Sequence, residues 1–160
     1  MLNQSFVNVL KTISERMENN GVLWAVVGST NLALQGIEIS PHDIDIIILV
    51  ENLSKIKNIF SEYHVSETEE MRSLVNEPWW RVKIDMDSLQ VEILGEKNTG
   101  IYANRLLSDK VVQIPLNDFS VPCLMLESEM QVYKETGRKN KADLIEKFLR
   151  TKKNKKCHGA

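Results

Sequence analysis

The segment Val22–Val50 constrains the fold more than any other part of this sequence, because two strand patterns flank a short helix pattern in it. Its first six residues are apolar and rich in valine, which is typical of a strand buried on both faces. Asp43-Ile44-Asp45 opens the second strand pattern, which continues with four apolar residues. Because side chains alternate between the faces of a strand, Asp43 and Asp45 are expected on one face, about 7 Å apart. The segment therefore predicts a sheet that presents two neighbouring carboxylates.

A Gly-Ser turn joins the first strand to the short helix pattern. Ser29 stands where a helix over residues 30–35 would begin, and serine is a preferred N-cap residue. Free backbone N–H groups at a helix N-terminus bind phosphate, so Gly28 and Ser29 are candidate phosphate-binding residues. Two neighbouring carboxylates raise each other's pKa unless a cation lies between them, and Mg²⁺ prefers oxygen ligands. Asp43 and Asp45 beside this turn therefore indicate a site that handles a nucleotide and a metal ion.

Composition limits the class of protein. The chain has 160 residues, enough for one domain with its own core. A net charge of −2 gives no general attraction to nucleic acid or to an anionic membrane. No apolar run is long enough to span a bilayer, and the N-terminus lacks the pattern of a signal peptide. Cys123 and Cys157 have no metal-ligand spacing, so they are expected to be reduced thiols in the cytoplasm.

Periodicity and turn residues predict the remaining elements. The last ten residues hold four lysines and no apolar run, so this end is expected to fray. A hairpin is expected where Met86-Asp87-Ser88 joins two strand patterns, and a loop with one helical turn near 71–75 is expected before it. The predicted helices cover 3–20, 53–63, 101–107, 121–135 (with Pro122 in its first turn) and a final stretch through Leu144, Phe148 and Leu149, and the predicted strands cover 79–85, 89–94 and 111–114.

The spacing of the central motif resembles that of a known superfamily. Gly28-Ser29, thirteen residues and then Asp43-Ile44-Asp45 are similar to the signature of the DNA polymerase β-like nucleotidyltransferases. The long spacer and His42 resemble the small antibiotic-modifying branch, the aminoglycoside and lincosamide nucleotidyltransferases. The segment Lys134–Asp143 is similar to the motif before the closing helix of those enzymes. The spaced motif is moderately specific, and either half alone would be weak.

This resemblance implies the fold and the division of the chain. The expected fold class is α/β (α+β), a nucleotidyltransferase fold in which a small mixed β-sheet is flanked by helices and followed by a C-terminal helical extension. Residues 1–120 would form the nucleotidyltransferase core and 121–151 the helical extension of the same domain. Residues 152–160 would form a basic flexible tail.

The resemblance also implies a reaction. The enzyme would transfer a nucleoside monophosphate from a nucleoside triphosphate, with ATP favoured, to a hydroxyl acceptor and would release pyrophosphate. Asp43 and Asp45 would hold two Mg²⁺ ions, with Mn²⁺ as an alternative. Gly28 and Ser29 would hold the β- and γ-phosphates of the leaving group. Positioning and charge neutralisation are most of what such phosphoryl chemistry requires of a protein.

The family carries a third metal-binding carboxylate on a neighbouring strand, and Glu92 matches that position. Glu92 is flanked by valine and isoleucine, and an acid in a buried strand requires a partner. It would complete the metal site or take the proton of the acceptor. Asp85 is the rival third carboxylate. Alternatively, Glu92 pairs across the hairpin with Arg81 or Lys83.

The C-terminal motif supplies candidate cations for the leaving group. In relatives, a lysine of this motif can face the triphosphate, and Lys134 and Lys141 are the candidates here. Cations at that position would offset the charge of the departing pyrophosphate. A junction between two helices, with both lysines in solvent, is the alternative interpretation.

A second class of function stays open. Glu92 is one methylene longer than the usual aspartate, so the domain could bind nucleotide and metal without catalysis, for instance as a toxin–antitoxin component. The expected partners of the enzyme are a nucleoside triphosphate and a small-molecule acceptor, with neither nucleic acid nor a membrane. A protein or RNA acceptor would keep the chemistry and change the partner.

Overall fold

The computed structural model of the protein describes residues 2–72 and 77–158. Its strands are β1 (Trp24–Val27), β2 (Ile44–Leu49), β3 (His64–Val65), β4 (Glu69–Met71), β5 (Trp79–Met86), β6 (Leu89–Glu96), β7 (Val111–Leu116) and β8 (Phe119–Leu124). Its helices are α1 (Gln4–Asn19), α2 (Gly28–Leu34), α3 (Ile56–Ile59), α4 (Ile101–Leu107), α5 (Leu126–Glu135) and α6 (Lys139–His158), and a 3₁₀ helix, η1, covers Val50–Lys55.

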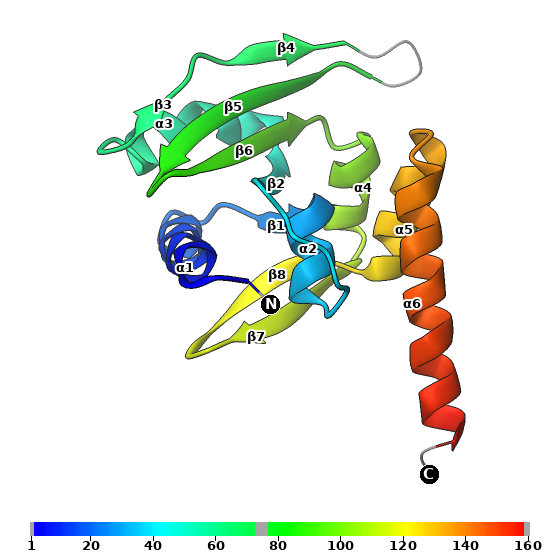
Figure 1. Ribbon diagram of the computed structural model, residues 1–160. Helices are drawn as coiled ribbons and strands as arrows, with labels where there is room; N and C mark the ends of the chain where they lie inside the picture. Colours follow the sequence, from blue (N-terminus) through cyan, green and yellow to red (C-terminus); the bar gives the residue numbers. More distant parts are fainter. Residues whose placement is uncertain (1, 73–76, 159–160) are drawn as a thin grey trace.

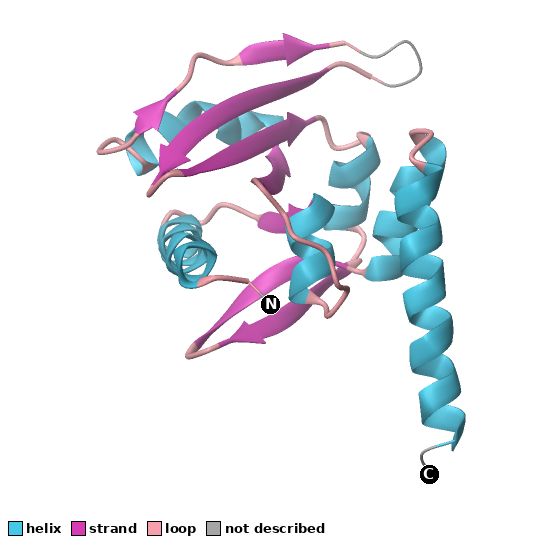
Figure 2. Ribbon diagram, viewed as in Figure 1, coloured by secondary structure: helices cyan, strands magenta, loops and turns pink. Residues whose placement is uncertain are grey.

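The strands form one mixed sheet. Along the sheet their order is β3-β5-β6-β2-β1-β8-β7, and β4 pairs with β5 beside β3. The central strand β2 is antiparallel to β1 and parallel to β6. Helices α1 and α4 lie on opposite sides of the sheet, and α5 and α6 pack together at one end (Figures 1 and 2). This is the mixed α/β fold with C-terminal helices that the sequence predicted.

The two faces of the central strands bury different side chains. Val26, Ile46 and Ile93 belong to the larger core, which α1 and α3 cover. Because side chains alternate along a strand, Asp45 and Glu92 lie on the other face, where α4 packs. The sheet face that carries the carboxylates is thus only partly covered by helices.

The predicted hairpin is confirmed. Strands β5 and β6 are antiparallel and pair Met86 with Leu89, so Asp87 and Ser88 alone form the turn. Both turn residues have positive φ, 49° and 69°, as a type I′ turn requires. The register sets Lys83 opposite Glu92.

The helix predicted over 121–135 is wrong in its first part. Residues Phe119–Leu124 form β8, which lies between β1 and β7, and helix α5 begins only at Leu126. Val121 and Cys123 are buried while Ser120 is exposed, an alternation that suits a strand. A residue before proline also favours extended backbone, which suits Val121.

Four smaller predictions also differ from the structure. Ser29 is not the N-cap of α2, because the helix already includes Gly28 and its cap is Val27. The helix predicted over 53–63 is divided into η1 and the short α3. The loop predicted before the hairpin contains β4, which ends at Met71. Of the helical turn predicted near 71–75, Met71 is therefore in a strand and Arg72 has no regular secondary structure, while 73–75 lie outside the described residues. Helix α6 continues through the predicted flexible tail as far as His158.

Within the two described ranges, no helix is long and apolar enough to cross a membrane.

Candidate active site

The parallel pairing of β2 and β6 brings two carboxylates together. Asp45 lies directly opposite Glu92 in the register, and both side chains are half-buried. Burial is the main cause that raises the pKa of Asp45 to about 7, and the negative charges of Glu92 and Asp43 raise it further. Such a pKa reports negative charge gathered in a poorly solvated place.

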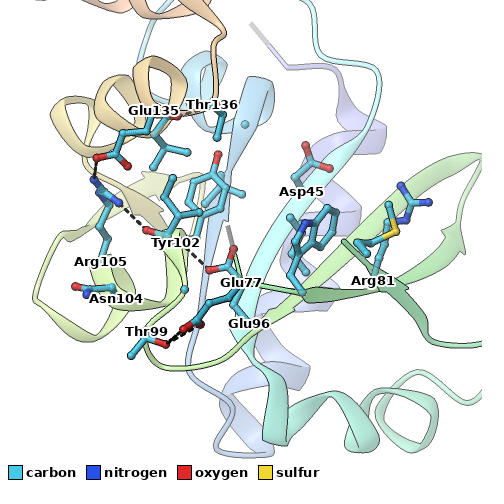
Figure 3. Close-up of a pocket in the computed structure, with 18 of the residues that line it drawn as sticks. Asp45, Glu77, Arg81, Glu96, Thr99, Tyr102, Asn104, Arg105, Glu135 and Thr136 are labelled. Carbon is cyan, nitrogen blue, oxygen red and sulfur yellow. Dashed lines mark hydrogen bonds and ion pairs between the residues drawn. The ribbon is translucent and has the colours of Figure 1, made fainter. Parts of the chain in front are cut away.

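Both carboxylates line a cavity of about 970 Å³ on this face of the sheet. In Figure 3, Asp45 and Arg81 lie on the strands, while Tyr102, Arg105 and Glu135 face them from the helices. The guanidinium of Arg105 lies 3.6 Å from the Glu135 carboxylate, which ties α4 to α5 across the cavity wall. The cavity is large enough for a nucleotide-sized ligand.

Asp43 lies one residue before β2, where its side chain is exposed. Thr30 fixes this point of the chain, because its buried hydroxyl donates a 2.7 Å hydrogen bond to the carbonyl oxygen of Asp43. Helix α2 thereby holds the start of β2 and with it the aspartate motif.

The donor set fits a hard divalent cation by charge and by atom type. Asp43, Asp45 and Glu92 offer carboxylate oxygens, and the negative charges of Glu92 and Asp43 add to the burial that raises the pKa of Asp45. In the part of the chain that the structure describes, however, no three Asp, Glu, His or Cys side chains are already gathered as a metal site. The metal-ligand role of the three residues therefore stays a prediction.

Arg81 competes for Glu92. Its guanidinium lies 3.9 Å from the Glu92 carboxylate and 3.3 Å from that of Glu69 on β4. The cross-hairpin partner considered from the sequence is thus present at the distance of a weak ion pair. The rival acid Asp85 is exposed near the β5–β6 turn, whereas Glu92 lines the cavity.

Gly28 lies close to the carboxylate of Asp45. Gly28 has φ +74°, and a Cβ atom placed there would lie 2.7 Å from Oδ2 of Asp45. Only glycine meets both demands, a left-handed backbone and this close approach. The N–H of Gly28 donates a 2.6 Å hydrogen bond to Oε1 of Glu129, so the expectation of a free N–H at this residue is wrong.

The two candidate lysines lie in different surroundings. Lys141 is half-buried on α6, donates a 3.0 Å hydrogen bond to the hydroxyl of Ser29 and lies 5.5 Å from the ring centre of Tyr133. Lys134 is exposed in the last turn of α5, and neither lysine is among the residues that line the cavity. The structure brings only Lys141 to the Gly-Ser turn.

Glu129 is a residue of the site that the sequence interpretation missed. Its side chain has no solvent exposure, and its carboxylate accepts hydrogen bonds from Gly28, from Asn31 and from the hydroxyl of Tyr102. A signal was present, because an acid at position 129 falls on the same helix face as Leu126 and Tyr133. Two aromatic residues, Trp79 and Tyr102, also line the cavity.

The fold and this arrangement define a class. A mixed sheet that sets acids on adjacent strands beside a Gly-Ser turn, with helices closing one side, is the architecture of a nucleotidyltransferase. The sequence profile of the aminoglycoside-2''-adenylyltransferase family matches residues 9–148, and the chain therefore belongs to that family. No protein of curated function matches the chain.

Solved structures agree with this assignment. A Thermotoga maritima protein, provisionally described as a nucleotidyltransferase, is 30% identical and has a TM-score of 0.72, with 94% of this chain and 96% of that chain covered. The antibiotic-resistance factor ANT(2'')-Ia is 12% identical, with a TM-score of 0.60 and coverage of 92% and 86%. The lincosamide antibiotic adenylyltransferase LnuA, solved with lincomycin, is 13% identical, with a TM-score of 0.58 and coverage of 86% and 94%. The last two likenesses concern the fold alone.

Proposed function

We propose that the protein transfers a nucleoside monophosphate from a nucleoside triphosphate, with ATP favoured, to a hydroxyl group of a small molecule and releases pyrophosphate. The observation that carries this proposal is the Asp45–Glu92 pair, whose carboxylates come from directly paired positions of β2 and β6 and line a cavity beside the Gly28 turn. A hydroxyl group attacks the α-phosphate, the bond to the β-phosphate breaks, and the hydroxyl proton leaves.

Each residue has a defined part in this reaction. Asp43, Asp45 and Glu92 would hold Mg²⁺ or Mn²⁺, which when bound supplies charge neutralisation at the phosphates and a lower pKa of the attacking hydroxyl. Glu92 would also accept the hydroxyl proton, and its position in the cavity lining supports this role. Lys141, hydrogen-bonded to Ser29, would bind the departing pyrophosphate.

The acceptor is proposed to be a small molecule that enters the cavity. ANT(2'')-Ia and LnuA are described as an antibiotic-resistance factor and a lincosamide antibiotic adenylyltransferase, and the shared fold motivates an acceptor of similar size. The aromatic rings of Trp79 and Tyr102 line the cavity and could stack on a base or on an acceptor ring.

Calorimetric titration with ATP, GTP, CTP and UTP in the presence of Mg²⁺ tests the proposal. Wild-type protein is expected to bind one or more of them in a metal-dependent manner, and Asp43→Ala/Asp45→Ala is expected to lose this binding while remaining folded. Pyrophosphate release with a panel of hydroxyl compounds then identifies the acceptor. Failure of folded wild-type protein to bind all four nucleotides contradicts the proposal.

A binding module without catalysis is the second candidate, and the contact between Arg81 and Glu92 favours it. An arginine that keeps Glu92 occupied would leave two aspartates for the metal, enough to bind a nucleotide and too few for efficient chemistry. This candidate predicts metal-dependent nucleotide binding with no pyrophosphate release for any acceptor. It also predicts that a partner chain co-purifies with the protein.

A further inference from the structure

Glu129 is the most deeply buried acid of the site and has three hydrogen-bond donors. Its Oε1 accepts from the N–H of Gly28 at 2.6 Å and from the amide of Asn31 at 3.1 Å, and its Oε2 accepts from the hydroxyl of Tyr102 at 2.7 Å. A carboxylate with no solvent exposure is stable only when its oxygens are hydrogen-bonded, and these donors meet that need.

The three donors come from separate parts of the chain. Gly28 and Asn31 belong to α2, Tyr102 to α4 and Glu129 itself to α5. The contact with Gly28 spans 101 residues of sequence, so it joins the C-terminal helices directly to the Gly-Ser turn. No other polar side chain among the described residues is seen to bond Gly28, whose N–H is thus fixed by α5.

The position of Gly28 in turn limits the position of Asp45. The two residues are so close that a Cβ on Gly28 would collide with Oδ2 of Asp45. A shift of the turn by a fraction of an ångström would therefore change the space available to this carboxylate. Ser29, the next residue, accepts from Lys141, so the same turn also sets the distance from the aspartate to the phosphate-binding lysine.

We propose that Glu129 is a positioning residue that holds the Gly28–Ser29 turn beside Asp45, an inference that rests on the proposed function. The length of the side chain makes this possible, because a glutamate at this position is long enough to bring a hydrogen-bond acceptor to the N–H of Gly28. It does not contact the reacting groups. The phosphates then bind to the Ser29 and Lys141 side of the turn, because Glu129 already occupies the N–H of Gly28.

Two conservative substitutions of Glu129 distinguish the effect of its side-chain length from the effect of its charge. Glu129→Gln keeps the length, and its amide oxygen can still accept from Gly28 while its NH₂ group meets a reoriented Tyr102 hydroxyl. Glu129→Asp keeps the charge but is one methylene too short. Glu96 gives a comparison with a second buried acid. It lines the same cavity, and its Oε1 accepts two backbone N–H groups at 2.8 Å each, from Tyr102 and Ala103 at the start of α4, so none of these hydrogen bonds reaches the Gly28 turn.

The experiment measures the dissociation constant of Mg²⁺·ATP, or of whichever nucleotide wild-type protein binds best, by calorimetry after circular dichroism confirms that each variant is folded. Glu129→Asp is expected to weaken binding at least tenfold, whereas Glu129→Gln and Glu96→Asp stay within threefold of wild type. Equal affinities for Glu129→Asp and wild type overturn the inference. So does an equal loss in Glu96→Asp, which would mean that any buried acid near α4 has the same effect.

Hydrogen exchange of the Gly28 amide keeps this result separate from the proposed function. The amide is expected to be protected in wild type, Glu129→Gln and Glu96→Asp, and to exchange at least tenfold faster in Glu129→Asp. If wild-type protein binds no nucleotide, the proposed function fails and this exchange rate still decides whether Glu129 positions the turn. Unchanged exchange in Glu129→Asp contradicts the inference.

Discussion

Asp45 and Glu129 both lie close to Gly28 and have different surroundings. Burial raises the pKa of both acids. At Asp45 the neighbouring charges of Glu92 and Asp43 raise it further, whereas at Glu129 the hydrogen bonds from Tyr102, Asn31 and Gly28 lower it again. The acids next to Asp45 therefore add to the effect of its burial, whereas the donors around Glu129 offset part of that effect and leave its pKa raised.

The groups that surround a buried acid indicate which role it can have. An acid whose charge is opposed by other acids in a cavity is the place where a cation would gain most on binding. An acid that accepts three hydrogen bonds from two other elements is suited to hold those elements in place.

The largest effect is expected from Asp45→Asn. Loss of one carboxylate from the proposed metal site should lower the rate of pyrophosphate release on the order of 10³-fold, about 4 kcal/mol, because the charge stabilisation of the transition state is lost. Asp85→Asn is the matched control, since that carboxylate is exposed near the β5–β6 turn. An equal loss of activity in both variants would contradict the assignment of Asp45 and would reopen the choice between Glu92 and Asp85.

The stability of the metal-free protein should depend on pH through Asp45. Its pKa is about 7 in the folded state against a reference of 3.8, so the folded protein retains a proton that the unfolded chain releases. The free energy of unfolding therefore falls as pH rises from about 4 to about 7, by at most roughly 4 kcal/mol. Denaturant titrations across this range measure the fall.

Two additions sharpen that measurement. For Asp45→Asn the free energy of unfolding should change less with pH, because asparagine has no proton to retain. The difference between the wild-type and variant curves gives the contribution of Asp45 to the pH dependence. Mg²⁺ should restore stability at pH 8 and have less effect at pH 5, where the proton competes with the metal. A wild-type curve as flat as that of Asp45→Asn would show that the charge of Asp45 is compensated after all.

The contrast also explains which residues could be predicted from the sequence. Asp45 and Glu92 could be proposed from the sequence, because strand alternation and the spacing after Gly28 are local patterns. Glu129 was hidden, because its partners lie 27 to 101 residues away and only tertiary packing brings them together. The strand β8 was misread as helix for a related reason, since its pairing with β1 and β7 cannot be read from residues 119–124 alone.

Gly28→Ala tests the contact that both acids share. The added Cβ collides with Oδ2 of Asp45, and the alanine must adopt φ +74°, so a loss of about 3 kcal/mol in the free energy of unfolding is expected. Gly21→Ala is the control for backbone strain alone, because Gly21 has φ +64° with no atom within 4 Å of the new Cβ, and about 1 kcal/mol is expected there. Chemical denaturation measures both values, and equal losses would mean that Asp45 moves away without cost.

The smallest effect is expected at Lys141, the lysine whose charge acts on Glu129. Lys141 lowers the pKa of Glu129 and hydrogen-bonds Ser29, so Lys141→Met should weaken Mg²⁺·ATP binding about tenfold through loss of a charged contact to phosphate. Lys134→Met, which removes the exposed lysine on α5, should change the dissociation constant less than about twofold, because screened surface charges contribute little. Calorimetry of the two variants decides which lysine serves the nucleotide. A larger loss in Lys134→Met would place the triphosphate over α5 and would separate the Gly-Ser turn from the phosphates.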